Sequence, residues 1–257
     1  MSTLQNVVYR GINMKLFMAG TSAFSWLFKE ITPLYVLESF YYIQDWQIKE
    51  IPKYKMFLLD SGAFTFMNNT KNKNGVDFDE YLTRYINFIN KNDIKYFFEL
   101  DIDSVVGYDK VKQLRKRLEK ETHKKCIPVW HKSRGLEEYI KLTKEYDYIA
   151  IGGIVTKEIK PSEYKFFPKL LEIASKNKCK VHGLGFTGKK AFKLNFYSVD
   201  STNWLQNGKF GGVEYFNGKE LVKVDAPKGK KNIYYRDRYK FLVPEYIKFQ
   251  KYLDKNL

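Results

Sequence analysis

Short apolar runs recur along the chain, and amphipathic segments separate most of them. The runs are continuous rather than alternating, which is typical of parallel strands buried on both faces. Eight runs are predicted strands: Lys15–Ala19, Tyr35–Ser39, Met56–Leu59, Tyr96–Leu100, Cys126–Trp130, Tyr148–Ile151, Lys180–Leu184 and Phe196–Val199. Of these, Tyr35–Ser39 is also compatible with a helix.

The segments between these runs have helical periodicity. Residues 78–89 place six apolar or aromatic residues on one helical face. Asp109–Thr122, Gly135–Tyr146 and Ser162–Lys176 are also predicted helices, with Ser162 as an N-cap after Pro161. Strands that alternate with helices predict a parallel sheet with right-handed crossovers. Eight such units predict an α/β fold of the (β/α)8 TIM-barrel type, with an open doubly wound sheet as the alternative.

The pattern changes after Asp200. Asn217-Gly218 separates the apolar segments 213–216 and 221–224, which predicts a β-hairpin. A closing helix is expected to begin near Pro244, with the proline in its first turn. We therefore expect one domain over residues 1–257, with a barrel at about 14–204 and a small C-terminal hairpin and helix appendage at about 205–257.

Composition adds a preference for an anionic partner. The 45 Lys and Arg residues exceed the 29 Asp and Glu residues, giving a formal charge of +16, and this excess favours nucleic acid. The two cysteines form no CxxC motif and the three histidines show no i, i+4 spacing, so we expect no metal and no cofactor. Without a signal peptide or an apolar run of about 20 residues, a cytoplasmic protein is expected.

Polar residues crowd at the predicted carboxyl ends of the strands, where β/α barrels place their chemistry. Asp60 and Asp200 are expected to face each other across one pocket. Paired carboxylates suit reactions at an anomeric carbon, where one attacks the carbon and the other handles a proton. Each aspartate alone is equally compatible with a helix N-cap. The other predicted substrate-binding residues are Ser61, Gly62, Asp101, Asp103, His131, Gly152, Gly153, His182, Gly183 and Gly185.

A family resemblance is carried by five short motifs in the same order. Leu59-Asp60-Ser61-Gly62-Ala63-Phe64 resembles the Asp-Ser-Gly-Gly-Phe signature of tRNA-guanine transglycosylases. Asp101-Ile102-Asp103 resembles that family's base-reading motif, and Ile151-Gly152-Gly153 resembles its glycine-bearing strand end. His182-Gly183-Leu184-Gly185 resembles a shortened form of its His-Leu-Met-Gly-Val-Gly. Ser198-Val199-Asp200-Ser201 resembles the strand that carries its nucleophile.

The resemblance implies a base exchange that leaves the nucleic-acid backbone intact. Asp200 would attack C1′, Asp60 would act as general base, and Asp101 or Asp103 would read the base. The glycine amides of 152–153 and 183–185 would bind its carbonyl side, and His131 and His182 would assist. The family's zinc-binding cysteines are absent, and the chain is short. Both features resemble the phage-type branch that inserts 7-deazaguanines into DNA, which would place the protein in the host cytoplasm.

The expected partners are therefore DNA, or alternatively tRNA, and a free 7-deazaguanine base, with no membrane involved; the oligomeric state stays open. A target inside a duplex must be flipped out before its C1′ can react. The predicted nucleic-acid-binding residues are Lys189, Lys190, Lys193, Lys228, Lys230, Lys231, Arg236 and Arg238. A retaining glycoside hydrolase and a non-enzymatic nucleic-acid-binding barrel are the remaining alternatives. A positive charge serves no purpose on a neutral sugar, and paired aspartates repel phosphate unless chemistry needs them.

Overall fold

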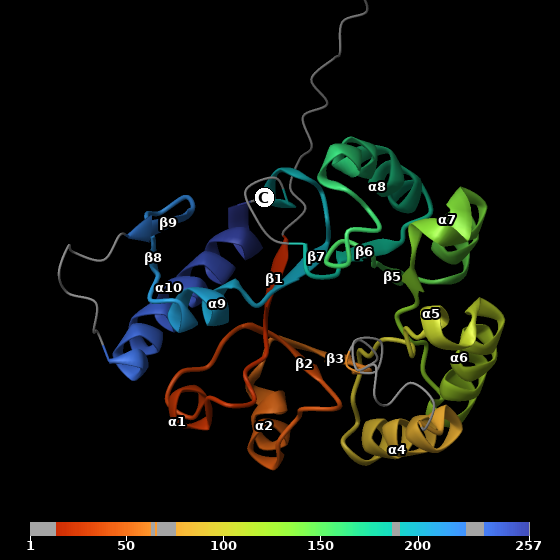
Figure 1. Cartoon of the computed structure of the whole chain (residues 1–257), viewed down its shortest axis with the longest axis horizontal. Coiled ribbons are helices and arrows are strands. Elements are labelled where there is room, and N and C mark those ends of the chain that lie inside the picture. The colour runs from red at the N-terminus through yellow and green to blue at the C-terminus, as the bar shows by residue number, and fades with distance from the viewer. Residues whose placement is uncertain (1–13, 63–64, 66–75, 187–190, 225–233, 257) are drawn as a thin grey trace, which may run out of the picture.

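The computed structural model describes residues 14–62, 65, 76–186, 191–224 and 234–256. It is an α/β fold in which seven parallel strands form one sheet that curls into a half-barrel. Figure 1 shows the helices lying around the outside of these strands. In their order across the sheet, the strands are β3 (Met56–Asp60), β2 (Tyr35–Ser39), β1 (Lys15–Ala19), β7 (Ser198–Ser201), β6 (Lys180–Gly183), β5 (Tyr148–Ile151) and β4 (Val129–Trp130).

The strand order is cyclic. The strands follow one another across the sheet in one direction, and the first strand, β1, pairs with the last strand of the sheet, β7. A doubly wound sheet reverses its direction at a switch point instead. The alternative considered from the sequence therefore does not describe this sheet.

The predicted strand Tyr96–Leu100 is not a regular strand. Phe97 makes an isolated parallel bridge with Leu59, and Phe98 makes one with Ile127. The ladder stops there because the N–H of Val129 donates to the side-chain Oε1 of Glu99 at 2.8 Å. A regular parallel ladder would direct such an N–H to a backbone carbonyl. The buried carboxylate of Glu99 thus replaces the backbone as acceptor and interrupts the strand.

Helices cover the convex side of the sheet. The helices predicted from residues 78, 109 and 135 are present, with boundaries within two residues of the prediction. The α-helices of the described residues are α1 (Ser25–Phe28), α2 (Asp45–Glu50), α4 (Phe78–Lys91), α5 (Asp103–Val106), α6 (Tyr108–Thr122), α7 (Gly135–Glu145), α8 (Phe167–Lys176), α9 (Asn203–Lys209) and α10 (Tyr235–Asn256). Short 3-10 turns are η1 (Ile51–Lys53), η2 (Lys132–Arg134), η3 (Pro161–Phe166) and η4 (Ala191–Lys193).

The helix predicted from Ser162 begins later, so Ser162 is not its N-cap. Residues 161–166 form the 3-10 turn η3, and α8 follows from Phe167. Pro168 explains the division, because it has no N–H to donate to the carbonyl of the preceding turn. Glu163 stabilises the start of η3 by accepting the backbone N–H of Lys160 at 3.0 Å.

The closing helix is longer than predicted. It begins at Tyr235, and Pro244 lies inside it. Leu242 and Val243 before the proline, and Tyr246 and Ile247 after it, pack in the same buried cluster. Packing on both sides of Pro244 therefore outweighs the hydrogen bond that a proline removes from a helix.

The predicted hairpin is confirmed. Strands β8 (Val213–Phe216) and β9 (Leu221–Val224) pair antiparallel around Asn217-Gly218. Oδ1 of Asn217 accepts the N–H groups of Lys219 and Glu220, and Gly218 has a φ of +93°. Within the ranges given above, no helix is long and apolar enough to cross a membrane.

The concave face of the sheet holds its own buried cluster. Residues from five strands meet in it, which requires them to point into the curl rather than toward the helices. Its members include Phe17, Ala19, Tyr35, Leu37, Met56, Leu58, Val129, Tyr148 and Ala150. Alternate residues of the same strands, such as Leu16 and Leu59, belong to clusters that include helix residues. The concave face is therefore packed below its carboxyl edge.

Candidate active site

Strand register brings Asp60 and Asp200 to the same face of the sheet. Registered partners share a face, and so do residues two apart along a strand. Asp200 pairs with Phe17 on β1. Ala19, two residues further along β1, pairs with Leu37 on β2, and Leu37 pairs with Leu58 on β3. Asp60 lies two residues beyond Leu58 on the same strand. All four intervening residues belong to the concave cluster. Both aspartates therefore lie on the concave face toward the carboxyl ends of β3 and β7.

Asp200 is held by two donors on one carboxylate oxygen. The N–H of Gly185 donates to Oδ1 at 2.6 Å, and Nε2 of His182 lies 3.2 Å from the same atom. No donor among the described residues contacts Oδ2. Because Asp200 itself is only 8% exposed, these contacts fix the carboxylate in one orientation.

Two hydroxyl groups continue the network behind His182. Nδ1 of His182 lies 2.7 Å from Oγ of Ser198, and that hydroxyl is hydrogen-bonded to the phenol of Tyr148. All three side chains are buried, and the imidazole packs against the rings of Phe17 and Phe98. Sequence alternation could have identified Ser198, because it lies two residues before Asp200 on the same strand.

Asp60 lies in a different environment. Its Oδ2 accepts the N–H of Gly62 at 3.0 Å, a residue with a φ of +78°. The pKa of Asp60 is raised from 3.8 to about 7, mainly by loss of hydration and also by the negative charges of Asp101 and Asp200, whereas the Gly62 hydrogen bond opposes the rise. Asp60 therefore exchanges a proton readily near neutral pH, and it is electrostatically coupled to Asp200.

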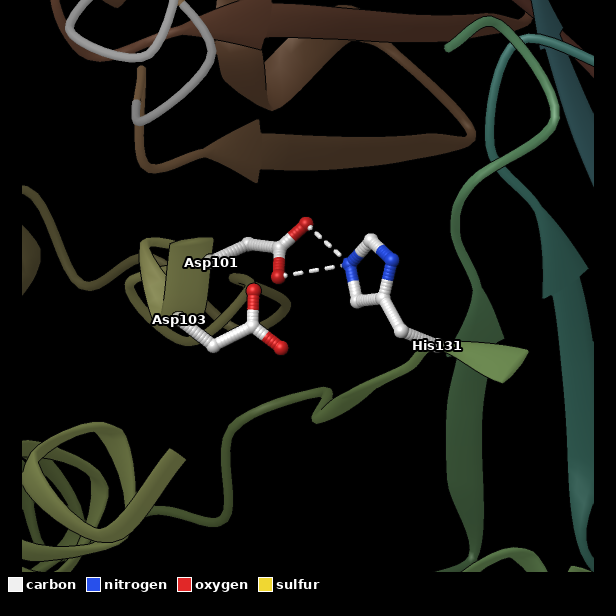
Figure 2. A group of neighbouring side chains, drawn as sticks. All are labelled: Asp101, Asp103 and His131. Atoms are coloured by element: carbon white, nitrogen blue, oxygen red, sulfur yellow. Dashed lines mark hydrogen bonds and ion pairs between the residues drawn. The ribbon is translucent and has the colours of Figure 1, made fainter. Parts of the chain in front are cut away.

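Asp101, Asp103 and His131 form a second cluster. Figure 2 shows the carboxylate of Asp101 facing the His131 ring, with Asp103 beside it. Nε2 of His131 lies 2.9 Å from each oxygen of Asp101, and Nδ1 lies 2.9 Å from Oε2 of Glu158. Burial alone would lower the pKa of His131, but these two carboxylates outweigh burial and raise it to about 9. The ring is thus cationic at neutral pH.

Arg134 neutralises the other side of this cluster. Its side chain is 3% exposed, its Nε donates to Oδ2 of Asp103 at 3.0 Å, and its Nη2 forms an ion pair with the same oxygen at 2.9 Å. It also lies 3.5 Å from Asp101 and 3.3 Å from the buried Glu99. One ligand atom each from Asp101, Asp103 and His131 lie within 4.8 Å of one another, as a metal site would require. Arg134 and the cationic His131 already supply positive charge to the two carboxylates.

The glycine amides are used differently from the prediction. The N–H of Gly152 donates to the carbonyl of Trp130 within the sheet, and the N–H of Gly185 donates to Asp200. Neither amide is therefore directed at a base. Gly152 instead leaves room for a side chain, because a Cβ there would lie 2.9 Å from Nε2 of His131. Gly153, with a φ of +76°, approaches Glu158 in the same way, and Gly183 lies within β6.

Ser61 does not line the candidate site. Its side chain is fully buried, and its hydroxyl has no hydrogen-bond partner among the described residues. Its backbone carbonyl accepts the phenol of Tyr81 at 2.6 Å. Ser61 follows Asp60 directly, so strand alternation points it away from the concave face.

The predicted nucleic-acid-binding residues are only partly described. Lys189, Lys190, Lys228, Lys230 and Lys231 lie outside the described residues. Arg236, in the first turn of α10, lies over the ring of Trp26 at 5.2 Å, and Arg238 is in the same helix. Lys193 lines a cavity of about 520 Å³ together with Lys178 and Lys180, at the amino end of β6. The structure therefore separates Lys193 from the edge that carries Asp200.

Four residues of the candidate site were not predicted from the sequence: Arg134, Glu158, Tyr148 and Ser198. Arg134 ends a 3-10 turn, and Glu158 lies in a loop after β5, so neither belongs to a periodic pattern.

No protein-family model matches this chain, and no curated protein matches it either.

Proposed function

We propose that this protein exchanges a base in nucleic acid, replacing guanine in DNA with a 7-deazaguanine through a covalent aspartyl intermediate. The proposal depends most on one observation. Asp60 and Asp200 lie on one face at the carboxyl edge of the sheet, coupled in charge but held in different ways. Asp200 is fixed by two donors, as a nucleophile requires. Asp60 has a pKa of about 7, as a general base at neutral pH requires.

The chemistry follows from these two environments. Oδ2 of Asp200 attacks C1′ of the nucleotide, and guanine leaves with the electrons of the C1′–N9 bond and takes up a proton from water. The bond between Oδ2 and C1′ holds the sugar while the free bases exchange. Asp60 removes the N9 proton of the incoming base, and N9 displaces Asp200 from C1′. Two displacements at one carbon give net retention.

Asp101 is suited to reading the base. Two cationic groups, His131 and Arg134, face its carboxylate, which therefore acts as an acceptor. The Watson–Crick edge of guanine offers donors at N1 and N2, which a carboxylate can accept together. Asp103 is the second choice as reader; its Oδ2 accepts a hydrogen bond from Nε of Arg134 and forms an ion pair with Nη2.

The resemblance to tRNA-guanine transglycosylases supports this assignment and suggests a closed barrel. In that interpretation, the segment at Phe97 and Phe98 stands between β3 and β4 as an irregular eighth strand, because it bridges to Leu59 and to Ile127. The cyclic strand order supports the same interpretation. The same exchange on tRNA is the alternative, since the charge of +16 suits either polyanion.

A trapping experiment tests the roles of both aspartates. Labelled single-stranded DNA is incubated with each protein without a deazaguanine, and a denaturing gel is used to detect a covalent adduct. Wild type and Asp60→Asn should form the adduct, whereas Asp200→Asn should not, because an amide is a poor nucleophile. Asp60→Asn should fail to turn over when 7-cyano-7-deazaguanine is added. An adduct with Asp200→Asn but not with Asp60→Asn would reverse the roles.

The nucleic acid itself is identified by its products. The protein is expressed in cells that are supplied with a deazaguanine. Their DNA and tRNA are digested to nucleosides, which are identified by mass spectrometry. A modified deoxynucleoside supports DNA as the substrate, and a modified ribonucleoside supports tRNA. Cells in which neither nucleic acid carries a deazaguanine would refute the proposed exchange. Binding to either polyanion should weaken steeply with salt.

A further inference from the structure

A buried chain of hydrogen bonds ends on the proposed nucleophile. It links the phenol of Tyr148, the hydroxyl of Ser198, the imidazole of His182 and Oδ1 of Asp200. Register aligns its parts, because Ser198 pairs with His182 across β6 and β7, and His182 pairs with Ala150 on β5. The proposed base exchange assigns no role to Tyr148 or Ser198.

Elementary hydrogen-bond chemistry gives the chain one direction. The N–H of Gly185 can only donate, so Oδ1 of Asp200 is an acceptor. Nε2 of His182 must then carry a proton to bond the same oxygen. A neutral ring leaves Nδ1 as an acceptor, and Ser198 must donate to it. The single proton of Ser198 is then used, so Tyr148 donates to Ser198.

The imidazole of His182 is enclosed by apolar rings. His182 and Ser198 are both 0% exposed. The rings of Phe17 and Phe98 lie 6.0 and 5.5 Å from the imidazole, measured between ring centroids. Asp200, two residues from Ser198 on the same strand, therefore contacts Nε2 of a fully buried ring.

We propose that Tyr148, Ser198 and His182 are positioning residues that fix the tautomer of His182 and thereby leave Oδ2 of Asp200 as the reacting oxygen. This inference rests on the proposed function. In the covalent intermediate, Oδ1 becomes the carbonyl oxygen of an ester with C1′. When N9 of the incoming base attacks C1′, the Oδ2–C1′ bond breaks and its electrons return to the carboxylate. The N–H groups of His182 and Gly185 stabilise that returning charge on Oδ1.

The first test measures directly which nitrogen of His182 carries the proton. The chain has three histidines, so nitrogen-15 NMR of the imidazoles is tractable, with His182→Gln used for assignment. The proposal expects His182 to carry its proton on Nε2, with Nδ1 unprotonated, at neutral pH. Ser198→Ala should give a mixture of tautomers. A wild-type ring with its proton on Nδ1, or with both nitrogens protonated, would overturn the directed chain.

The second test separates positioning from folding. Ser198→Ala should lower kcat for base exchange about tenfold, the rate equivalent of one hydrogen bond, with KM for 7-cyano-7-deazaguanine unchanged. The covalent adduct should accumulate during turnover, and Ser198→Thr should restore the rate. Ser201→Ala is the matched control, because this serine is buried on the same strand and bonds the N–H of Asn203 instead.

The outcomes distinguish the two proposals. An unchanged kcat in Ser198→Ala, with exchange intact in wild type, would overturn the positioning role while sparing the proposed function. A loss of rate that Ser198→Thr does not restore, together with a matching loss of thermal stability, would assign Ser198 to packing. A wild-type protein that exchanges no base would overturn the proposed function and the catalytic part of this inference. The tautomer measurement would still decide the direction of the chain.

Discussion

Nε2 of His131 lies 2.9 Å from both carboxylate oxygens of Asp101. This contact fixes the ring that Gly152 accommodates and presents Asp101 at the carboxyl edge of the sheet. It also makes the stability of the folded protein depend on pH, because the pKa of His131 is raised from 6.5 to about 9. The stabilisation from the protonated ring is fully present below about pH 6.5 and is lost as the pH rises through 9.

The first prediction concerns stability between pH 7 and pH 10. Wild type should lose up to roughly 3 kcal/mol more of its unfolding free energy over this interval than His131→Gln does, because each pKa unit is worth about 1.4 kcal/mol. Urea denaturation at several pH values measures both proteins. Parallel pH profiles for the two proteins would show that His131 is not held as a cation.

The second prediction concerns the cost of keeping Asp60 charged. Its pKa of about 7 exceeds its ordinary value, so the folded protein loses stability as the pH rises from about 4 to 7. Asp60→Asn should therefore raise the unfolding free energy at pH 8 by about 1–3 kcal/mol, and this gain should disappear toward pH 4. The side chain of Asp109 is 91% exposed, so Asp109→Asn should show no such gain. A destabilised Asp60→Asn at pH 8 would contradict the argument.

The third prediction concerns the close packing of Gly152 against His131. A Cβ on Gly152 would lie 2.8 Å from Cε1 of His131 and 2.9 Å from Cγ1 of Val129. Gly152→Ala should displace the ring from Asp101 and destabilise the protein by about 1–3 kcal/mol, as overpacking does. It should also lower the pKa of His131, which an NMR titration measures. At Gly212 the nearest atom would lie 3.4 Å away, so Gly212→Ala should leave that pKa unchanged.

The sequence predicted the strands well where packing alone determines them. The boundaries of Lys15–Ala19, Tyr35–Ser39 and Tyr148–Ile151 are confirmed, because these continuous apolar runs are buried on both faces. Prediction failed where a side chain or a proline competes with the regular backbone. Glu99 takes the N–H of Val129 and interrupts one strand, and Pro168 divides one helix from the turn before it.

In the candidate site, too, the residues set by local sequence properties were predicted and those set by tertiary packing were not. Strand ends and alternation are local properties, so they sufficed to place Asp60, His182 and Asp200 at one edge of the sheet. Arg134 and Glu158 come from a turn and a loop whose positions depend on tertiary packing. The amide of Gly185 was expected to bind the base. Its actual acceptor, Asp200, lies 15 residues away, and no local pattern identifies such a pair.

The last prediction concerns metal at the cluster of Asp101, Asp103 and His131. The three side chains have the spacing of a metal site. Arg134 nevertheless donates to Asp103 at 3.0 Å, and the protonated Nε2 of His131 is directed at Asp101. A divalent ion would have to displace the buried guanidinium and remove the proton from the ring, and both steps oppose binding. Wild type should therefore bind no stoichiometric zinc or manganese at pH 7 by equilibrium dialysis.

Arg134→Met provides the comparison for this cluster. Removing the guanidinium leaves Glu99, Asp101 and Asp103 without their shared cation, so the variant should be destabilised by about 3–5 kcal/mol. Its three carboxylates and His131 should then bind zinc more tightly than wild type does, and zinc should restore part of the lost stability because it binds the folded state. Thermal denaturation of both proteins with and without zinc measures the effect. Zinc that stabilises wild type and resists chelation would show that Arg134 does not exclude a metal.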